Sequence, residues 1–338
     1  MKNYFHSQIK PFSHLLQKAN PSFIEDAYAR QYLEQLLLAR EYFLRIYSDC
    51  LQKAFPRMAG DEALIDFGCG NGLLALFAKF CGIKKVYAVD RNTAFLDAAK
   101  QLSAQVSVNI DDWINSNEET IVNYFPPAKP NALIATDVIE HIYNPDKFLS
   151  SLRQWSGSMK MIFTTSAVNE NPFIRMKLKQ SHKIAEWKIN NPVHSALPEF
   201  AGLSYLEARK KMIEKKYPAL PAEKVLQFAR QTRGLMRQDI FNVIDGKIHY
   251  LPSHPTNTCD PLTGSWAERL LPLKTYLEIF NRHHCRMYVS KGYYNEFRMG
   301  VGGAACFLIN RIIPLSGFLL VPFLFFEVIP GGGNIREP

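Results

Sequence analysis

Apolar runs and amphipathic stretches alternate along residues 63–165. The apolar runs are short, as in buried strands, and the stretches between them carry apolar residues at helical spacing. We predict strands at 63–67, 85–89, 107–110, 132–136 and 159–165, and helices at 72–80, 93–103 and 145–155. This alternation is typical of an α/β fold, in which helices cover both faces of a mainly parallel sheet.

Both ends of the chain extend this pattern. Residues 24–55 have apolar residues at helical spacing and no internal Gly or Pro, which predicts one or two helices before the first strand. Near the other end we predict a helix at 267–282 and a strand at 285–294. The segment after the fifth strand lacks clear strands and is predicted to be helical. We therefore expect four parts: an N-terminal helical cap (1–57), an α/β core (58–165), a basic helical insertion (166–266) and a C-terminal part of the core (267–338).

Residues 300–329 are strongly apolar, and two interpretations are open. The segment 323–329 has the length of a buried strand and is bounded by Pro322 and Pro330. We favour burial of the whole stretch, because Pro314 and Pro322 interrupt any long helix. The alternative is a segment that lies on a membrane surface as a peripheral contact. No run of about 20 uninterrupted apolar residues occurs, so no membrane-spanning helix is predicted.

The net charge of +9 is concentrated in the insertion. Residues 171–240 contain 14 basic and 6 acidic residues, a net charge of +8. This excess indicates either a solvated helical face or a surface that attracts an anionic substrate.

The six cysteines are scattered, without the spacing of a metal site or a disulfide framework. Residues 1–16 lack the continuous apolar core of a signal peptide. We therefore expect reduced, mostly buried thiols and a cytoplasmic protein.

Three glycines alternate directly after the first predicted strand, in the pattern Asp66-x-Gly68-x-Gly70-x-Gly72. The Gly-Lys-Ser/Thr of a phosphate-binding loop is absent, and Leu73 stands where the dinucleotide fingerprint requires its third glycine. Glycine permits unusual backbone angles and lets a ligand approach the bare backbone. Asp66 can accept hydrogen bonds from an ammonium group or from loop amides, so a ligand with a cationic amino-acid tail suits this loop better than a diphosphate.

Together with later positions, this loop resembles the class I S-adenosylmethionine-dependent methyltransferases. Asp90 closes the second predicted strand, and the sequence Asn-Ile-Asp-Asp-Trp at 109–113 closes the third. The resemblance implies a Rossmann-like seven-stranded sheet of order 3-2-1-4-5-7-6, with an antiparallel seventh strand. The candidate sixth and seventh strands are 285–294 and 323–329.

The resemblance also implies the residues that bind the cofactor. An acidic residue at the position of Asp90 bridges the two ribose hydroxyls, and a carboxylate after the third strand approaches the adenine amino group. Asp111 and Asp112 are both candidates for the second role. Trp113 either stacks on the adenine or belongs to the core. The residues that we expect to bind S-adenosylmethionine are Asp66, Gly68, Cys69, Gly70, Gly72, Asp90, Arg91, Asp111, Asp112, Trp113 and Asp137.

The sequence Thr-Asp-Val-Ile-Glu-His at 136–141 follows the fourth predicted strand, where ligands bind in such sheets. It resembles the Glu-x-x-Glu-His stretch of ubiquinone-biosynthesis O-methyltransferases, in the methyltransferase type 11/12 group, and of small-RNA 2′-O-methyltransferases. In one interpretation His141 is the catalytic general base, with Glu140 beside it. In a second, Asp137, Glu140 and His141 bind a divalent cation such as Mg²⁺. In a third, Glu140 and His141 are structural.

Two further sets of side chains are candidates in the second half of the chain. A fourth metal ligand would come from His182 or His194. The loop 253–269 is dense in turn formers, and we expect it to lie over the mouth of the pocket. Its candidates for substrate contact are His254, Asp260, Trp266 and Arg269.

The resemblance implies an enzyme that transfers a methyl group from S-adenosylmethionine. We expect the acceptor to be an oxygen of a small-molecule, glycan-linked or lipid-linked compound, and the basic insertion indicates that it carries phosphate or carboxylate. One alternative is an RNA 2′-O-methyltransferase, but the chain has no appended RNA-binding module, so nucleic acid is not the expected partner. The other alternative is a partner protein that binds the cofactor without turnover.

Overall fold

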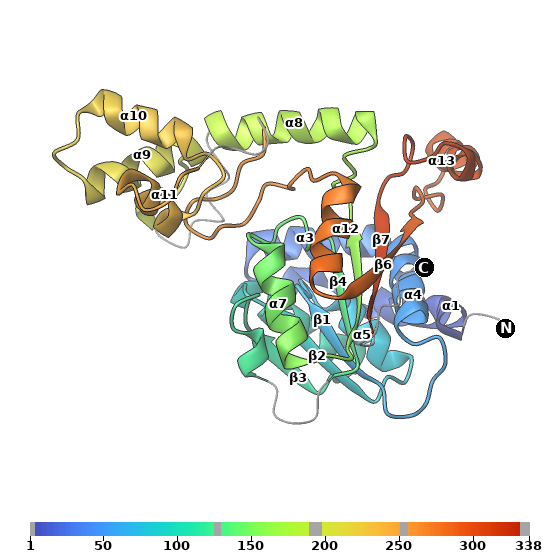
Figure 1. Ribbon diagram of the computed structural model, residues 1–338. Helices are drawn as coiled ribbons and strands as arrows, with labels where there is room; N and C mark the ends of the chain where they lie inside the picture. Colours follow the sequence, from blue (N-terminus) through green and yellow to red (C-terminus); the bar gives the residue numbers. More distant parts are fainter. Residues whose placement is uncertain (1–3, 125–129, 189–197, 251–255, 332–338) are drawn as a thin grey trace. The chain divides into compact units, whose positions relative to one another are not determined.

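The computed structural model of the chain describes residues 4–124, 130–188, 198–250 and 256–331. The chain divides into two compact units (Figure 1). The core unit comprises Met1–Ile139, Pro145–Ser166 and Lys274–Pro338, and the insertion unit comprises Glu140–Asn144 and Ala167–Leu273.

The core unit is built on a seven-stranded sheet of order β3-β2-β1-β4-β5-β7-β6, which confirms the order that the resemblance implied. Strand β7 runs antiparallel to both of its neighbours, as expected for the seventh strand. The strands are β1 (Ala63–Phe67), β2 (Lys85–Asp90), β3 (Asp112–Asn115), β4 (Ala132–Thr136), β5 (Lys160–Thr165), β6 (Cys285–Lys291) and β7 (Leu324–Pro330).

Helices cover both faces of this sheet, with α4 and α5 on one face and α7 and α12 on the other (Figure 1). The helix α12 starts later than the predicted residue 267 because Pro272 directly precedes it, and the residue before a proline is disfavoured in a helix. The helices outside the insertion are α1 (Tyr4–Ser7), α2 (Ile9–Leu15), α3 (Ala27–Leu38), α4 (Arg40–Ala54), α5 (Leu73–Phe80), α6 (Thr93–Val106), α7 (Pro145–Trp155), α12 (Leu273–Arg282) and α13 (Val301–Ile312), with short 3₁₀ turns at Leu16–Lys18, Pro21–Phe23, Ile121–Asn123 and Ile313–Leu315.

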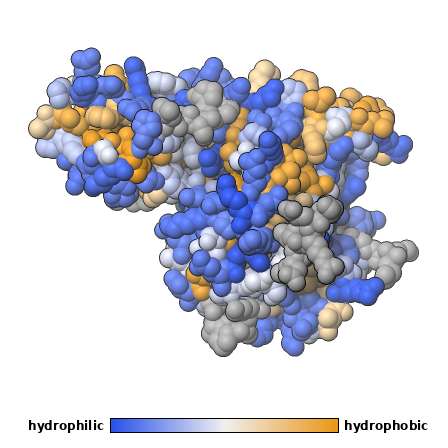
Figure 2. All heavy atoms as spheres, in the orientation of Figure 1, coloured by the Kyte–Doolittle hydropathy of each residue, from blue (hydrophilic) through white to orange (hydrophobic). Residues whose placement is uncertain are grey.

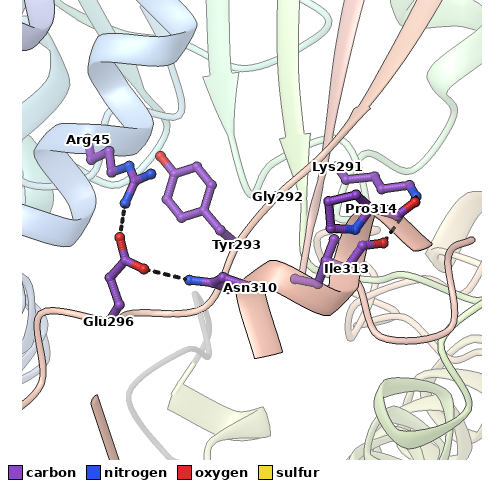
Figure 3. Close-up of a pocket in the computed structure, with 8 residues that line it drawn as sticks. All are labelled: Arg45, Lys291, Gly292, Tyr293, Glu296, Asn310, Ile313 and Pro314. Carbon is purple, nitrogen blue, oxygen red and sulfur yellow. Dashed lines mark hydrogen bonds and ion pairs between the residues drawn. The ribbon is translucent and has the colours of Figure 1, made fainter. Parts of the chain in front are cut away.

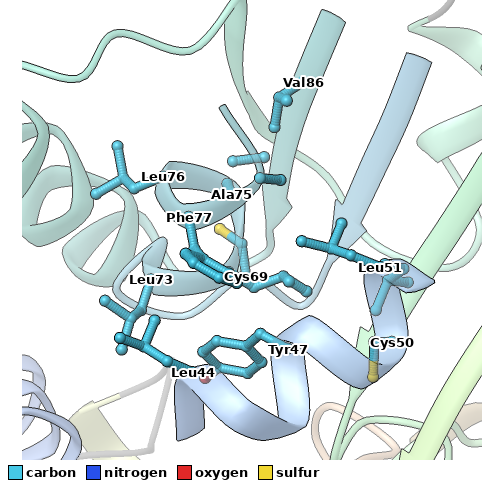
Figure 4. Close-up of a cluster of buried hydrophobic side chains, with 14 of the residues drawn as sticks. Leu44, Tyr47, Cys50, Leu51, Cys69, Leu73, Ala75, Leu76, Phe77 and Val86 are labelled. Atoms are coloured by element: carbon cyan, nitrogen blue, oxygen red, sulfur yellow. The ribbon is translucent and has the colours of Figure 1, made fainter. Parts of the chain in front are cut away.

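The N-terminal helices are part of the main core. In Figure 4, Leu44, Tyr47 and Leu51 of α4 face Leu73 and Phe77 of α5, and all five side chains are buried. Helix α5 is apolar on nearly every side, so it needs a cover on its outer face as well as the sheet beneath it. The amphipathic helix α4 supplies that cover and thereby fixes the start of α5, where the glycine loop ends.

The third strand lies further along the chain than predicted. Residues 107–110 precede it, and the strand itself is Asp112–Asn115, paired in parallel with β2 alone. As an edge strand it is mostly polar, so its sequence lacks the apolar run of a buried strand. Val108 and Ile110 carry the apolar signal instead, because they pack against the main core just before the strand begins.

The C-terminal apolar stretch is only partly buried. The strand predicted at 323–329 is confirmed as β7, with Leu324, Phe326 and Val328 buried. The prediction of burial is wrong for residues 301–319, where large apolar side chains of α13 and of the following turn are exposed. The helix lies on a connection between β6 and β7, where only one of its sides contacts the rest of the unit.

The insertion unit is helical. Its helices α9 and α10 pack around Ile213, Val225 and Ala229, and its interior holds an ion pair between Arg209 and Glu186. The elements are α8 (Pro172–Trp187), a 3₁₀ turn (Pro198–Phe200), α9 (Tyr205–Lys216), α10 (Ala222–Gln231) and α11 (Arg237–Ile244).

All six cysteines are free thiols, and five of them are buried, which confirms the prediction that the thiols are mostly buried. Within the described ranges, no helix combines the length and the apolar character that crossing a bilayer requires.

Candidate functional site

The glycine loop connects β1 to α5 in a conformation that other residues rarely adopt. The φ angles of Gly68, Gly70 and Gly72 are +71°, +51° and +72°. The loop is held against the end of β2 because the amides of Gly68 and Cys69 both donate to the carbonyl of Val89, at 2.8 and 3.0 Å. The Cys69 side chain points into the main core, and burial raises the pKa of its thiol.

The three glycines face different neighbours. A Cβ added to Gly68 would lie 2.5 Å from Val138, and one added to Gly72 would lie 3.0 Å from the ring of Trp113. These two glycines are therefore required by the packing of the chain itself, and Trp113 lies against the core. A Cβ at Gly70 would meet the ring of Tyr32 at 3.2 Å. At Gly70, therefore, the neighbour of the bare backbone is the outer edge of the Tyr32 ring and not the packed core.

Asp90 is the last residue of β2, and its side chain is hydrogen-bonded to the glycine loop. Its carboxylate accepts hydrogen bonds from the amides of Gly70, at 2.9 Å, and Asn92, at 2.8 Å. A carboxylate offers about four acceptor positions, so two remain for a pair of hydroxyl donors. Burial raises the pKa of Asp90. The next residue, Arg91, is exposed. The position and remaining capacity of Asp90 fit the ribose of an adenosyl cofactor.

Asp66 joins β1 to the first turn of α5, because its carboxylate accepts a hydrogen bond from the amide of Ala75 at 3.0 Å. Of the two roles that its sequence position allowed, the structure shows the bond to a backbone amide. Burial, with a smaller contribution from the charge of Asp90, raises the pKa of Asp66 to about 8. Asp66 therefore holds a proton near neutral pH, and negative charge on the neighbouring Asp90 disfavours a diphosphate at this loop, because like charges repel.

We expect the replacement Asp66→Asn to change how stability depends on pH. Between the ordinary Asp pKa and about 8, the folded chain holds a proton on Asp66 that the unfolded chain has released. The free energy of unfolding therefore falls as pH rises through this range, by at most about 1.4 kcal/mol per pH unit. Asn keeps an acceptor for Ala75 and cannot ionise, so urea unfolding at several pH values should show this fall in the wild type but not in the variant. Parallel curves for the two proteins would contradict the assignment.

Asp111 and Asp112 do not lie at the carboxyl end of β3, where the resemblance placed them. Asp112 is the first residue of the strand, and Asp111 precedes it, pairing with Lys79 at 2.7 Å. The end next to Asp90 is instead formed by Asn115, whose amide donates to the carbonyl of Asp90 at 3.1 Å. The polar residues after the apolar pair 113–114 were the sequence signal for this strand end.

Helix α3 lies over the glycine loop, an arrangement that the sequence analysis did not predict. The buried side chain of Asn71 donates to the carbonyl of Ala29 at 2.8 Å and ties the loop to this helix. Tyr28 and Tyr32 both pack against the ring of Phe95 on α6. Desolvation raises the pKa of Tyr32, and the nearby carboxylate of Asp137 raises it further. The spacing of two tyrosines four residues apart, on one helix face, was the available signal.

Asp137 follows directly after β4 with a φ angle of +52°, which is unusual for a residue other than glycine. Its amide donates to the carbonyl and to the hydroxyl of Thr164 on β5, both at 3.1 Å. The residue is exposed at the carboxyl edge of the sheet. This sharp turn ends the strand and starts the connection to Glu140 and His141.

His141 belongs to the insertion unit, where its ring is oriented by a backbone group. Its Nδ1 lies 2.7 Å from the carbonyl oxygen of Trp266, and the amide of Trp266 donates to the carbonyl of His141. Because a carbonyl oxygen can only accept, Nδ1 carries the hydrogen and Nε2 of the neutral ring keeps its lone pair. This arrangement suits a general base and does not require a metal.

The side chains proposed as metal ligands do not form a site in the structure. Among the described residues, no three His, Cys, Asp or Glu side chains are grouped so that they could hold a metal ion. Glu140 is buried. His182 is buried as well, with its Nε2 3.0 Å from the carbonyl of Glu268, and burial lowers its pKa. His194 and His254 lie outside the described residues.

The loop candidates Trp266 and Arg269 belong to one aromatic cluster. Trp266 stacks on Tyr143 with ring centroids 6.2 Å apart, and its indole nitrogen donates to the carbonyl of Tyr143 at 3.1 Å. The guanidinium of Arg269 lies 4.3 Å from the centroid of the Trp266 ring. Asp260 has a local role, because its carboxylate accepts from the amide of Leu262 within a turn. The cluster holds the carbonyl that orients His141.

Comparison with known proteins indicates the class of this site. A family model described as a methyltransferase domain matches residues 38–209. The ribosomal protein L11 methyltransferase of Shewanella denitrificans is 32% identical over 93 residues, which are 28% of this chain and 29% of that protein. That of Acinetobacter baumannii (strain AYE) is 34% identical over 86 residues, 25% of this chain and 28% of that protein. The chain thus spans less than a third of the length of these curated relatives.

Solved structures with similar folds include the phosphoethanolamine N-methyltransferase 2 of Haemonchus contortus in complex with S-adenosyl-L-methionine. The TM-score is 0.41 at 14% identity, over 85% of this chain and 53% of that one. The plantazolicin methyltransferase BamL has a TM-score of 0.42 at 11% identity, over 98% of each chain.

Proposed function

The chain belongs to the family of methyltransferase domains, and we propose that it transfers the methyl group of S-adenosylmethionine to an oxygen of an anionic acceptor. The acceptor that we propose is a small molecule or a glycan-linked or lipid-linked compound. We propose an oxygen acceptor because the carbonyl of Trp266 orients His141 as a base. A hydroxyl acceptor must lose a proton during transfer, and such a base can take it.

The residues around the glycine loop fit the cofactor. Asp90 has the capacity to hold a ribose hydroxyl, and Gly70 offers bare backbone. The bound cofactor supplies an activated methyl group on a positively charged sulfur. The protein then has to align the acceptor with that group and exclude water, which can contribute about 7–11 kcal/mol to lowering the barrier.

His141 is the proposed general base. The bond from Nδ1 to Trp266 leaves Nε2 ready to accept the proton of a hydroxyl. The stack of Trp266 on Tyr143 and the guanidinium of Arg269 over the same ring keep that carbonyl in place. Glu140 directly precedes His141 in the sequence, and its side chain is buried. We propose that it has a supporting role in this segment.

A basic stripe on α8 supports an anionic acceptor. Arg175, Lys179 and Lys183 are spaced by four residues and therefore lie on one face of the helix. They line a surface hollow of about 600 Å³ together with Lys177, and no acidic side chain takes part in its lining. Such a cationic surface raises the local concentration of an anionic substrate.

We expect neutralising this stripe to weaken acceptor binding without slowing the chemistry. The triple variant Arg175→Gln, Lys179→Gln, Lys183→Gln should raise KM for the acceptor about 10- to 100-fold and leave kcat nearly unchanged. A matched control removes the same charges from exposed positions on α9 and α10, with Lys216→Gln, Lys224→Gln and Arg230→Gln. If both triple variants raise KM equally, the effect is one of net charge and the stripe is not an acceptor site.

The proposed function is tested by transfer of labelled methyl from S-adenosylmethionine into extracts separated into metabolites, lipids, glycans and RNA. Label in an anionic metabolite, glycan or lipid, removed by treatment that cleaves methyl ethers or esters, would support the proposal. Label that appears in RNA alone would instead favour the 2′-O-methyltransferase alternative. Binding of the cofactor with no label in any fraction would favour an inactive partner protein.

A further inference from the structure

An ordinary surface helix buries its apolar side, whereas helix α13 exposes most of its large apolar side chains. The side that faces the rest of the core unit carries Gly303, Cys306 and Asn310, whereas most of the large apolar side chains are exposed. Figure 2 shows the resulting apolar surface, in orange, over this helix. We define the α13 surface by its exposed side chains, which are Met299, Val301, Phe307, Leu308, Ile312, Leu315 and Leu319.

The reversed orientation is fixed by polar contacts on the inner side. The side chain of Asn310 accepts from the amide of Tyr294 at 2.7 Å and donates to its carbonyl at 3.0 Å. It also donates to Glu296, which pairs with Arg45 on α4 (Figure 3). A Cβ on Gly303 would lie 1.8 Å from the carbonyl oxygen of Arg298, so the helix is seated closely on the preceding segment. These contacts prevent the helix from rotating its apolar side inward.

The outward apolar side is accompanied by positive charge only. From 297 to 326 the sequence contains no Asp or Glu, and it contains Arg298 and Arg311. The guanidinium of Arg311 lies 4.2 Å from the ring centroid of Phe307, next to the exposed residues. Lys291 lies at the same, C-terminal end of the helix, where its ammonium donates to the carbonyls of Ile313 and Pro314 (Figure 3).

We propose that the α13 surface docks onto a lipid bilayer that contains anionic headgroups. An amphipathic helix with large apolar side chains and flanking arginines is suited to the interface between headgroups and acyl chains. With 12 residues the helix is about 18 Å long, which is too short to cross the hydrocarbon core and sufficient to lie in this interface. A protein partner would instead be expected to meet the arginines with carboxylates, and a second copy of this surface, being basic itself, offers none.

Flotation with vesicles tests this proposal on the full chain. The wild-type protein should float with vesicles of phosphatidylcholine containing phosphatidylglycerol, and it should bind pure phosphatidylcholine at least about tenfold more weakly. The triple variant Val301→Ser, Leu308→Ser, Leu315→Ser should lose binding to the mixed vesicles by at least about tenfold. Binding of S-adenosylmethionine should be unchanged in this variant, which separates failure of docking from failure of the proposed function.

A matched control is Leu38→Ser on α3, since Leu38 is 87% exposed, like Val301 at 87% and Leu315 at 88%. The control should float like the wild type. The proposal is overturned if the wild type does not bind the mixed vesicles, or if the triple variant binds them as tightly. A wild-type dimer in sedimentation that the triple variant converts to a monomer, without vesicle binding, would assign the surface to self-association instead.

Discussion

The variant Gly70→Arg is expected to bind S-adenosylmethionine at least about 100-fold more weakly than the wild type, while it remains folded. Gly70 has a left-handed φ angle, and a Cβ there would lie 3.2 Å from the ring of Tyr32, so any side chain has to displace that ring. An arginine would occupy the space in front of the loop and bring a guanidinium next to Asp90, whose carboxylate is bonded to the amide of Gly70. That charge would pair with the carboxylate that we propose for the ribose hydroxyls. Titration calorimetry with the cofactor measures the effect.

The control for this variant is Gly82→Arg. Gly82 also has a left-handed φ angle, of +89°, but a Cβ there would meet no atom within 4 Å. Both variants therefore cost about 1–2 kcal/mol of backbone strain, and only the first obstructs the loop. Gly82→Arg should bind the cofactor like the wild type. Undiminished affinity in a folded Gly70→Arg variant would show that the cofactor does not bind at this loop.

The variant His141→Asn is expected to lower kcat for methyl transfer by about 10²- to 10⁴-fold, the range of general acid–base catalysis. The Asn amide can still donate to the carbonyl of Trp266, so the local structure is retained while the proton acceptor is removed. Affinity for S-adenosylmethionine should not change, because the proposed role of His141 concerns the acceptor. Steady-state kinetics with the acceptor found in the labelling experiment, together with cofactor titration, give both quantities.

Two controls decide how the His141 result is interpreted. His249→Asn changes an exposed histidine of the same unit and should leave kcat as in the wild type. A chelator should not affect the wild-type rate, since the proposed base accepts the proton of a hydroxyl without the help of a cation. A His141→Asn variant that retains nearly full kcat would remove His141 from the mechanism. Loss of activity on chelation, restored by Mg²⁺, would favour the cation alternative.

The sequence was sufficient for the parts of this protein that depend on local pattern. The apolar runs at 63–67 and 132–136 are β1 and β4, because central strands are buried on both faces and contain little else. The pattern of glycines after β1 marked the loop correctly, because positive φ angles leave few alternatives to glycine. Asp90 ends β2 as predicted, and its role at the ribose, which the resemblance to class I methyltransferases implied, stays a prediction.

The sequence was less informative at the edges of the sheet. Strand β3 has a neighbour on one side only, so it can be polar, and the apolar signal shifted to residues that pack just before it. That displacement moved the predicted strand end to Asp111 and Asp112, which the structure places at the start of the strand.

Only the tertiary structure decided which side chains face one another across the chain. The cover of α3 over Gly70, the carbonyl of Trp266 at His141 and the outward apolar side of α13 all join residues that are distant in sequence or depend on which helix side is anchored. Hydrophobic periodicity indicates that a helix has an apolar side, but not whether that side meets the core. For α13 the answer came from a single asparagine and a glycine that hold its other side inward. Strand positions follow from local burial, whereas the partners of a surface depend on long-range contacts that the pattern does not encode.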